Sequence, residues 1–392
     1  MQKEAQDCFL LQYEKRKMQE CAGTLHNMAA VFLLEQEENE VDREKFFDKK
    51  RLQESRMIVA NHLKEMAEIM EKAASEITRI VRLGEKKEKQ IAKAFLMEGL
   101  VLEDFYILEK ESHRKEVIIR AYQNSMVIKN KICSVEDIGT FLSVLLNLRL
   151  VPSLRTPYFI TEKSENFCFE EDTKYMVLTG YAKSVKEGEK ISGDTYTFFE
   201  SQERKFIGVL SDGMGSGEKA AKDSEMVLDM AERFLESGFS LELTAKMVND
   251  TILLGTEEKN MSTLDMCSID LYTGEAEFFK VGAAYGLLKR DGYVEKIPSA
   301  SLPLGIFSDL QNNYLKKQLL EGDYIFLFSD GVLEHFSDEK GEEFLKEIVA
   351  QISYRRPTEM AAHIMRHAIS MAKGRIRDDM TILVLGIWEN TR

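Results

Sequence analysis

Two apolar stretches of this sequence end in the same tripeptide, Ser-Asp-Gly. Residues 205–210 (KFIGVL) run into Asp212, and residues 324–328 (YIFLF) run into Asp330. Both stretches have the length and residue types of a buried strand, and a strand fixes the direction of the side chain at its end. Aspartate offers hard oxygen ligands to a cation, and a glycine after it leaves room for the backbone to approach one. A single Asp-Gly pair is usually only a turn, so a metal site requires further carboxylates.

Further carboxylates flank these two. Asp194 follows Ser-Gly ahead of the first tripeptide, and Asp378 and Asp379 precede the last apolar stretch, residues 380–388. Carboxylates from separate elements cannot share a small volume uncompensated, because like charges raise one another's pKa. Divalent cations resolve that repulsion, and Mg²⁺ and Mn²⁺ prefer oxygen ligands of this kind. The combination therefore predicts a site for divalent cations.

The elements that must position these residues are strands and helices from about residue 165 onward. Hairpin turns are expected at residues 272–274 and 290–292. Helical periodicity covers residues 216–236, 241–254, 341–353 and 358–373. Strands interrupted by pairs of helices favour packed sheets with helix layers outside, rather than repeated βαβ units.

The first part of the chain has a different character, being highly charged and nearly free of glycine and proline. Between residues 46 and 83, apolar side chains recur at three- and four-residue spacing, which predicts an amphipathic helix that Gly84 ends. Strands are expected at residues 101–108 and 116–121, with a helix within residues 138–151. The expected parts are a helical arm over 1–95, a small α/β module over 96–160 and a larger domain over 161–392.

Composition excludes some functions. The net charge of −14 argues against nucleic acid as a partner, because phosphate backbones are held by surplus Lys and Arg. The 5 cysteines are scattered without a CxxC pair, which indicates a reducing compartment. No apolar run reaches the roughly 18 residues of a membrane span, and the first residues lack the order of a signal peptide. As given, the chain is expected to be cytoplasmic.

The order of these motifs resembles the PPM-type (protein phosphatase 2C-like) serine phosphatases, in the branch of stage II sporulation protein E. The resemblance covers about residues 165–390, and residues 51–70 are similar to the regulatory region that precedes the phosphatase in that branch. The segments that carry it are ISGD (191–194), LSDGMGSG (210–217), STLDMCSIDLYTGEAEFFKVGAA (262–284), SLPLGI (301–306), FSDG (328–331) and RDDMTILVL (377–385).

The resemblance implies an α+β fold, an αββα sandwich with metals at one edge, preceded by a helical and small α/β regulatory region. It implies two Mn²⁺ or Mg²⁺ ions that activate water for attack on a phosphoryl group, with no covalent phospho-enzyme. The residues that it marks as holding the ions are Asp194, Asp212, Gly213, Asp330, Asp378 and Asp379.

Within this set the resemblance gives separate roles. Asp212 would contact both ions, and Asp194 would share one of them with the Gly213 carbonyl. Asp330 would hold the other ion together with Asp378, which the family motif favours over the aspartate that follows it. In some related phosphatases a basic residue four positions before the first acidic ligand binds phosphate, and here that position is Lys190.

The function implied is a metal-dependent protein serine/threonine phosphatase. Its substrate would be a phosphoserine on an anti-sigma-factor antagonist, so that dephosphorylation activates a sporulation sigma factor. The helical arm would be regulatory and could form a homodimer. Two alternatives stay open: a stress-response phosphatase of the same fold, and a scaffold that binds a division-site protein. The branch is known as membrane-anchored, so this chain is either the soluble portion of a longer protein or a version without the anchor.

Overall fold

The structure is a computed structural model whose contacts divide the chain into two compact units, Met1–Asp172 and Thr173–Arg392. The residues described are 2–33, 43–81, 83–110, 114–124, 133–154, 156–201, 203–254, 261–299, 302–306, 310, 314–336 and 339–391. Ser301, which begins the SLPLGI motif, lies outside these ranges. Among the described residues, no helix has the length and apolarity needed to cross a membrane.

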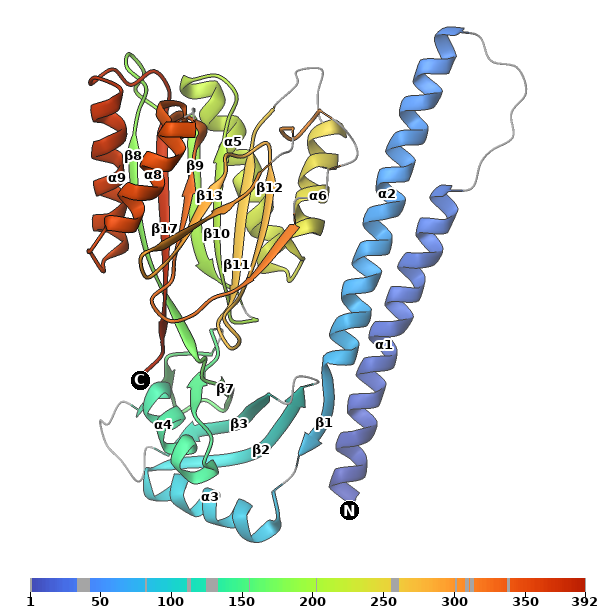
Figure 1. The fold of residues 1–392 in the computed structure, drawn as a ribbon. Helices are drawn as coiled ribbons and strands as arrows, with labels where there is room; N and C mark the ends of the chain where they lie inside the picture. The colour runs from blue at the N-terminus through green and yellow to red at the C-terminus, as the bar shows by residue number, and fades with distance from the viewer. Residues whose placement is uncertain are drawn as a thin grey trace. The chain divides into compact units, whose positions relative to one another are not determined.

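The first unit begins with two long helices, α1 (Gln2–Leu33) and α2 (Arg43–Glu76), which lie side by side (Figure 1). Alanines seven residues apart are buried along both helices: Ala22 and Ala29, then Ala60, Ala67 and Ala74. A seven-residue repeat keeps small side chains on one face, where they allow two helices to pack closely. Longer apolar side chains expected in the helical stripe, such as Met57 and Met66, are exposed instead.

The helix predicted to run on to Gly84 ends earlier, at Glu76. Strand β1 (Ile77–Val81) follows directly and pairs antiparallel with β2 (Leu100–Lys110). The sequence of β1, ITRIV, is rich in β-branched residues, which favour a strand over a helix. Gly84 therefore does not end a helix but precedes one, as the N-cap of α3 (Glu85–Met97).

A five-stranded sheet completes the first unit, in the order β1-β2-β3-β7-β5. Its remaining elements are β3 (Lys115–Gln123), α4 (Val135–Leu146), β5 (Leu150–Pro152), β7 (Glu165–Glu171) and the short pair β4 (Cys133–Ser134) and β6 (Phe159–Ile160). Phe95 of α3 and Leu142 of α4 pack with Phe167 of β7 in one apolar core. Because β7 pairs with β3, the unit extends to Asp172, beyond the boundary expected near residue 160.

The second unit consists of two antiparallel five-stranded sheets with helices outside (Figure 1). The first sheet, ordered β15-β12-β11-β10-β9, contains β9 (Asp194–Glu200), β10 (Lys205–Asp212), β11 (Leu264–Asp270), β12 (Glu275–Val281) and β15 (Tyr314–Gln318). The second, ordered β14-β13-β16-β17-β8, contains β8 (Tyr175–Ser184), β13 (Gly286–Arg290), β14 (Tyr293–Ile297), β16 (Tyr324–Phe328) and β17 (Met380–Glu389).

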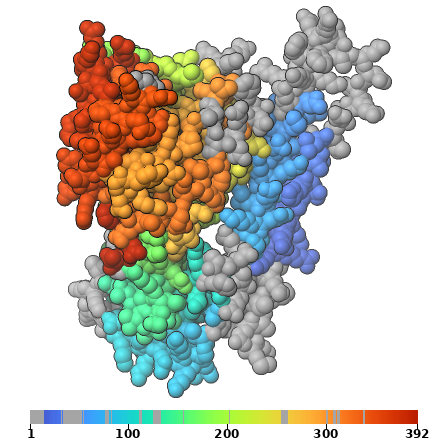
Figure 2. Space-filling view, in the orientation of Figure 1, coloured from blue at the N-terminus to red at the C-terminus, as the bar shows by residue number. Residues whose placement is uncertain are grey.

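Helix layers cover the outer faces of these sheets. Helices α5 (Gly217–Glu236) and α6 (Leu241–Leu254) pack on the first sheet. Helices α8 (Glu339–Gln351) and α9 (Pro357–Met371) pack on the second, and their side chains form the orange-to-red surface in Figure 2. These helices agree with the predicted periodic segments, and the αββα sandwich is confirmed.

Alternating residues of both sheets fill the space between them. The apolar core there includes Leu210, Cys267, Phe278, Leu327 and Leu385. Since successive strand residues point to opposite faces, this burial fixes which side chains leave the core at the strand ends. Asp212 lies two residues after the buried Leu210 and therefore emerges on the same inter-sheet face at the rim of the sandwich.

Candidate metal centre

Strand pairing brings the predicted acidic residues to one end of the sandwich. Asp194 starts β9 and Asp212 ends β10, and the two residues are direct partners in the antiparallel register. Asp330 starts α7 (Asp330–Leu333) after β16, and Asp378 precedes the neighbouring strand β17. Each sheet therefore contributes two of the predicted carboxylates.

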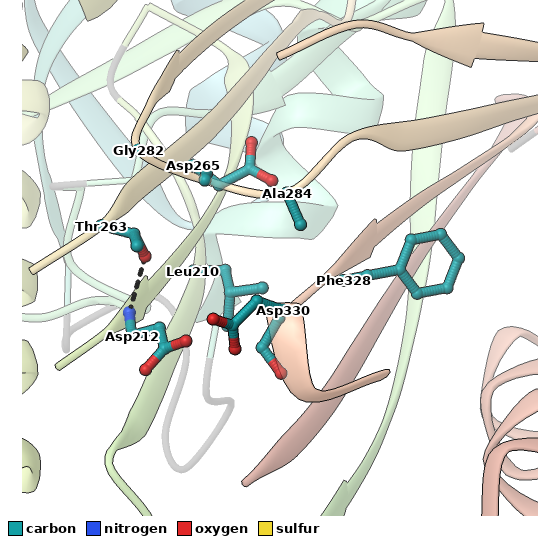
Figure 3. A pocket seen from close by; sticks show the side chains of 10 residues that line it. Leu210, Asp212, Thr263, Asp265, Gly282, Ala284, Phe328 and Asp330 are labelled. Atoms are coloured by element: carbon teal, nitrogen blue, oxygen red, sulfur yellow. Dashed lines mark hydrogen bonds between the residues drawn. The ribbon is translucent and has the colours of Figure 1, made fainter. Parts of the chain in front are cut away.

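A small pocket separates Asp212 from Asp330, which come from different sheets (Figure 3). It is lined by Leu210, Asp212, Thr263, Asp265, Gly282, Ala283, Ala284, Phe328, Ser329 and Asp330. Hydrogen bonds hold its rim, since Thr263 Oγ1 accepts from the Asp212 amide at 2.9 Å. The Asp212 carbonyl accepts from the Ser262 hydroxyl and from the Thr263 amide, both at 2.8 Å. The STLD motif thus fixes the backbone of Asp212, a role that sequence reasoning did not assign.

Asp194 is deeply buried at this end of the sandwich, with 1% of its surface exposed. Neither of its carboxylate oxygens has a hydrogen-bond partner among the described residues. Burial raises the pKa of Asp194 to about 6, the nearby hydroxyls of Thr381 and Ser329 oppose that rise, and the charge of Asp379 adds to it. A buried carboxylate without partners is costly, and a bound cation is the partner that would offset that cost.

The pKa of Asp212 is raised further, to about 10, first by burial and then by the charges of Asp194 and Asp330. Burial and the charge of Asp330 also raise the pKa of Asp378. Within the described ranges, no three Asp, Glu, His or Cys side chains are grouped closely enough to hold one ion as they stand. The charges of Asp194, Asp330 and Asp378 all act on Asp212, and this mutual repulsion fits a need for divalent cations.

Gly213 has no room for a side chain. A Cβ on it would lie 2.0 Å from the carbonyl oxygen of Ala220 in α5. Its amide donates to the Gly193 carbonyl at 3.2 Å, so the turns before Asp194 and after Asp212 are tied together. A glycine is therefore required where the backbone passes between α5 and the acidic side chains.

Asp378 and Asp379 have different surroundings. Asp379 is 3% exposed, and its two oxygens accept from the Lys186 amide at 2.9 Å and the Gly193 amide at 2.7 Å. The Asp378 side chain is 32% exposed, and its Oδ1 lies 4.0 Å from Lys186 Nζ. Asp378 is thus the better placed of the two to bind an ion. Lys190, the predicted phosphate-binding residue, is exposed on the same loop.

Comparison with known proteins places this site in a family. The model for stage II sporulation protein E (SpoIIE) matches residues 202–388, and the model for the SpoIIE regulatory domain matches residues 3–133. The solved structure of the PP2C phosphatase domain and a fragment of the regulatory domain of SpoIIE from Bacillus subtilis matches with a TM-score of 0.63 and 26% identity, over 89% of this chain and 97% of that chain. The chain belongs to the SpoIIE family of PP2C-type serine phosphatases.

Curated relatives agree with SpoIIE-family membership. Stage II sporulation protein E of Bacillus subtilis (strain 168) is 30% identical over 346 residues, which is 88% of this chain and 41% of that protein. Phosphoserine phosphatase RsbU of the same organism is 24% identical over 200 residues, 50% of this chain and 59% of RsbU. The chain spans about half the length of the curated relatives it matches. The resemblance predicted from the sequence is confirmed, and the role of each ligand stays a prediction.

Proposed function

We propose that this SpoIIE-family chain is a metal-dependent protein serine/threonine phosphatase with two Mn²⁺ or Mg²⁺ ions at the acidic end of the sandwich. Asp194 and the Gly213 carbonyl would hold one ion, Asp330 and Asp378 the other, and Asp212 both. The observation that carries the proposal is the buried Asp194 carboxylate, whose oxygens have no partner among the described residues. When bound, such ions lower the pKa of a water molecule and offset the charge of phosphoryl oxygens.

Neither Cys267 nor Cys168 offers a competing nucleophile. Cys267 is buried between the sheets, and burial raises the pKa of its thiol far above neutral pH. Burial also raises the pKa of Cys168 in the first unit, to about 12. A thiol attacks phosphate as the thiolate, which neither residue forms near pH 7. This supports hydrolysis by water over a cysteinyl-phosphate route.

The proposed substrate is a phosphoserine on an anti-sigma-factor antagonist, whose dephosphorylation would activate a sporulation sigma factor in the cytoplasm. The two SpoIIE models, which match both parts of the chain, support the sporulation role. A stress-response phosphatase of the same fold is the second candidate, and the similarity to the phosphoserine phosphatase RsbU supports the chemistry that both candidates share. A scaffold that binds a division-site protein is less well supported, since the predicted acidic ligands Asp194, Asp212, Asp330 and Asp378 are all present.

Phosphate release from a phosphoserine antagonist protein tests this proposal. The full chain should release phosphate with Mn²⁺ and lose that activity in excess chelator, because the carboxylates alone repel a phosphoryl dianion. A stress-response antagonist, phosphorylated in the same way, serves as the competing substrate. Absence of release from either protein at saturating Mn²⁺ would contradict the phosphatase assignment, and preference for the second would favour the alternative role.

Lys186 is a second basic residue to test beside Lys190, because its ammonium lies at the rim of the site near Asp378. A charge-assisted hydrogen bond to the phosphoryl group contributes about 1.5–3 kcal/mol. Lys186→Ala should therefore raise the KM for phosphoprotein by about 10- to 100-fold. Lys186→Arg should recover most of the loss, and Lys340→Ala on the exposed side of α8 should change nothing. A larger effect from Lys190→Ala would support the original prediction instead.

The arm formed by α1 and α2 is proposed to regulate the phosphatase and to form a homodimer. Several apolar side chains along it are exposed: Met18, Met28, Val31, Leu33, Met57 and Met66. Burial of these side chains against a second copy would stabilise a dimer, since exposed apolar area favours association. Residues 173–392 alone should then be monomeric and should release phosphate more slowly than the full chain, as light scattering and the phosphatase assay would show. Equal rates for the two proteins would argue against regulation by the arm.

A further inference from the structure

The carboxylate of Asp379 joins two segments that are distant in the sequence. It precedes β17 in the second sheet, and its oxygens accept from the amides of Lys186 and Gly193, at the two ends of the loop before β9. The loop is also held by the Glu187 amide, which donates to the Ile376 carbonyl at 2.8 Å. Asp379 thus connects the two ends of the 186–193 loop to the start of β17.

Gly193 is held tightly in this arrangement. Its amide donates to Asp379, its carbonyl accepts from Gly213, and a Cβ on it would lie 2.9 Å from the Cβ of Ala220. The next residue is Asp194, which pairs with Asp212 in the β9–β10 register and whose carbonyl accepts from Lys183 Nζ at 2.6 Å. The contacts of Gly193 therefore fix the backbone on the N-terminal side of Asp194. Because the Asp194 oxygens have no partner among the described residues, the Asp194 carboxylate is not itself what holds it in place.

We propose that Asp379 is a positioning residue, which holds the 186–193 loop closed and thereby keeps Asp194 aligned with Asp212. This rests on the proposed function, since it assigns Asp379 a task other than that of a metal ligand. Charge-assisted hydrogen bonds to a carboxylate are about twice as strong as neutral ones. An oxygen of Asp379 that moved away from its amide donor to reach a cation would leave that buried backbone amide unpaired, which is costly.

The same contacts place Lys186. Its amide is bonded to Asp379, while its ammonium reaches towards Asp378. Asp379 therefore binds the backbone of Lys186, and the adjacent Asp378 lies near its side-chain ammonium. Loss of the Asp379 carboxylate is expected to displace both Asp194 and Lys186, whereas loss of the Asp378 carboxylate leaves the loop closed.

Hydrogen–deuterium exchange on the full chain in excess chelator tests the inference without any metal or substrate. In Asp379→Asn, the amide group can accept only one of the two bonds, so amides of residues 186–193 should exchange about 10- to 100-fold faster. Asp378→Asn is the matched variant, and its exchange over the same residues should equal that of the wild type. Calorimetric titration with Mn²⁺ should show weaker binding in both variants, by about 10- to 100-fold for Asp379→Asn, as expected for a residue that orients a ligand.

Weaker Mn²⁺ binding in Asp379→Asn without faster exchange would make Asp379 a ligand and overturn the inference. Faster exchange with unchanged Mn²⁺ binding would also overturn it, because the loop would then not align Asp194. If Asp379→Asn does not fold, exchange in the wild type tests the inference instead. The inference requires that the amides of Lys186 and Gly193 exchange slowly, and fast exchange at either amide would overturn it. A wild type that has this protection but releases no phosphate would count against the proposed function alone.

Discussion

Asp212→Asn should lower Mn²⁺-dependent phosphate release at least about a thousandfold, while making the protein in chelator more stable at pH 8. The loss of activity follows because Asp212 is the carboxylate proposed to contact both ions, and two-metal charge stabilisation contributes several kcal/mol at about 1.4 kcal/mol per tenfold in rate. The gain in stability follows because Asp212 is partly buried and faces the charges of Asp194 and Asp330. The wild type must either bear that repulsion or take up a proton on folding to relieve it, and the neutral amide requires neither.

The stability effect has a definite pH dependence. Unfolded aspartates release their protons near pH 3.9, about the value for model peptides. In the folded protein, the pKa of Asp194 is about 6 and that of Asp212 about 10. Above pH 4 the folded state thus binds more protons than the unfolded state, so stability falls as pH rises, by up to about 1.4 kcal/mol per pH unit for each such proton. Between pH 6 and 9 the slope should come chiefly from Asp212.

Urea unfolding in chelator at pH 5 to 9 measures this dependence. The curve for Asp212→Asn should be nearly flat above pH 6, whereas the wild type should lose stability steadily. Asp229→Asn on the exposed face of α5 is the control and should follow the wild type. Parallel curves for the wild type and Asp212→Asn would show that Asp212 is not held in a charged, buried cluster.

The acidic site could be predicted from the sequence because its residues sit at strand ends marked by apolar runs. The buried strand before Asp212 and the one before Asp330 both fix a side chain at the sandwich rim, and the structure brings these residues together there. The task of Asp379 could not be predicted. It depends on a backbone amide 186 residues away in the chain, and hydrogen bonds to backbone leave no signature in residue type.

The arm shows a different limit of sequence reasoning. Apolar periodicity located α2 but not its packing face, because the seam is formed by alanines such as Ala60 and Ala67 rather than by the larger Met57 and Met66. Small side chains permit a close approach of two helices. Which face of α2 is buried therefore depends on its packing against α1, and not on the sequence of α2 alone. The start of β1 was missed for a related reason, since a strand is stabilised by its pairing with β2 as much as by its own residues.

An ion pair that sequence reasoning did not identify lies at the wall of the pocket. Asp265 of β11 and Lys280 of β12 are register partners whose side chains are 1% exposed. The Lys280 ammonium contacts Asp265 Oδ2 and donates to the Ala284 carbonyl at 3.1 Å. Asp265 Oδ1 has no hydrogen-bond partner within the described part of the chain. The pair therefore sits in the inter-sheet core at a cost that its own attraction and the bond to Ala284 offset.

Lys280→Met should destabilise the protein by about 3–5 kcal/mol, because it leaves the Asp265 carboxylate buried without its partner. Burial raises the pKa of Asp265 and Lys280 opposes that rise, so removal of the lysine should raise this pKa further. The folded variant would then bind a proton that its unfolded chain releases near pH 4. Its deficit relative to the wild type should consequently shrink as pH falls towards 5 and grow above it. Urea unfolding at pH 5 and pH 8 measures both effects.

The double variant Asp265→Leu with Lys280→Met separates the cost of an unpaired buried charge from the net contribution of the ion pair to the free energy of unfolding. An apolar pair of similar volume leaves no buried charge, so its stability should return to within about 1 kcal/mol of the wild type or exceed it. The coupling energy from the four proteins should then be at least about 3 kcal/mol, as expected for residues in contact. A double variant as unstable as Lys280→Met would mean that the core cannot repack at this position. Phosphate release by a stable double variant that fell well below the wild type would show that the pair shapes the pocket wall beside Asp212, because stability alone could not explain the loss.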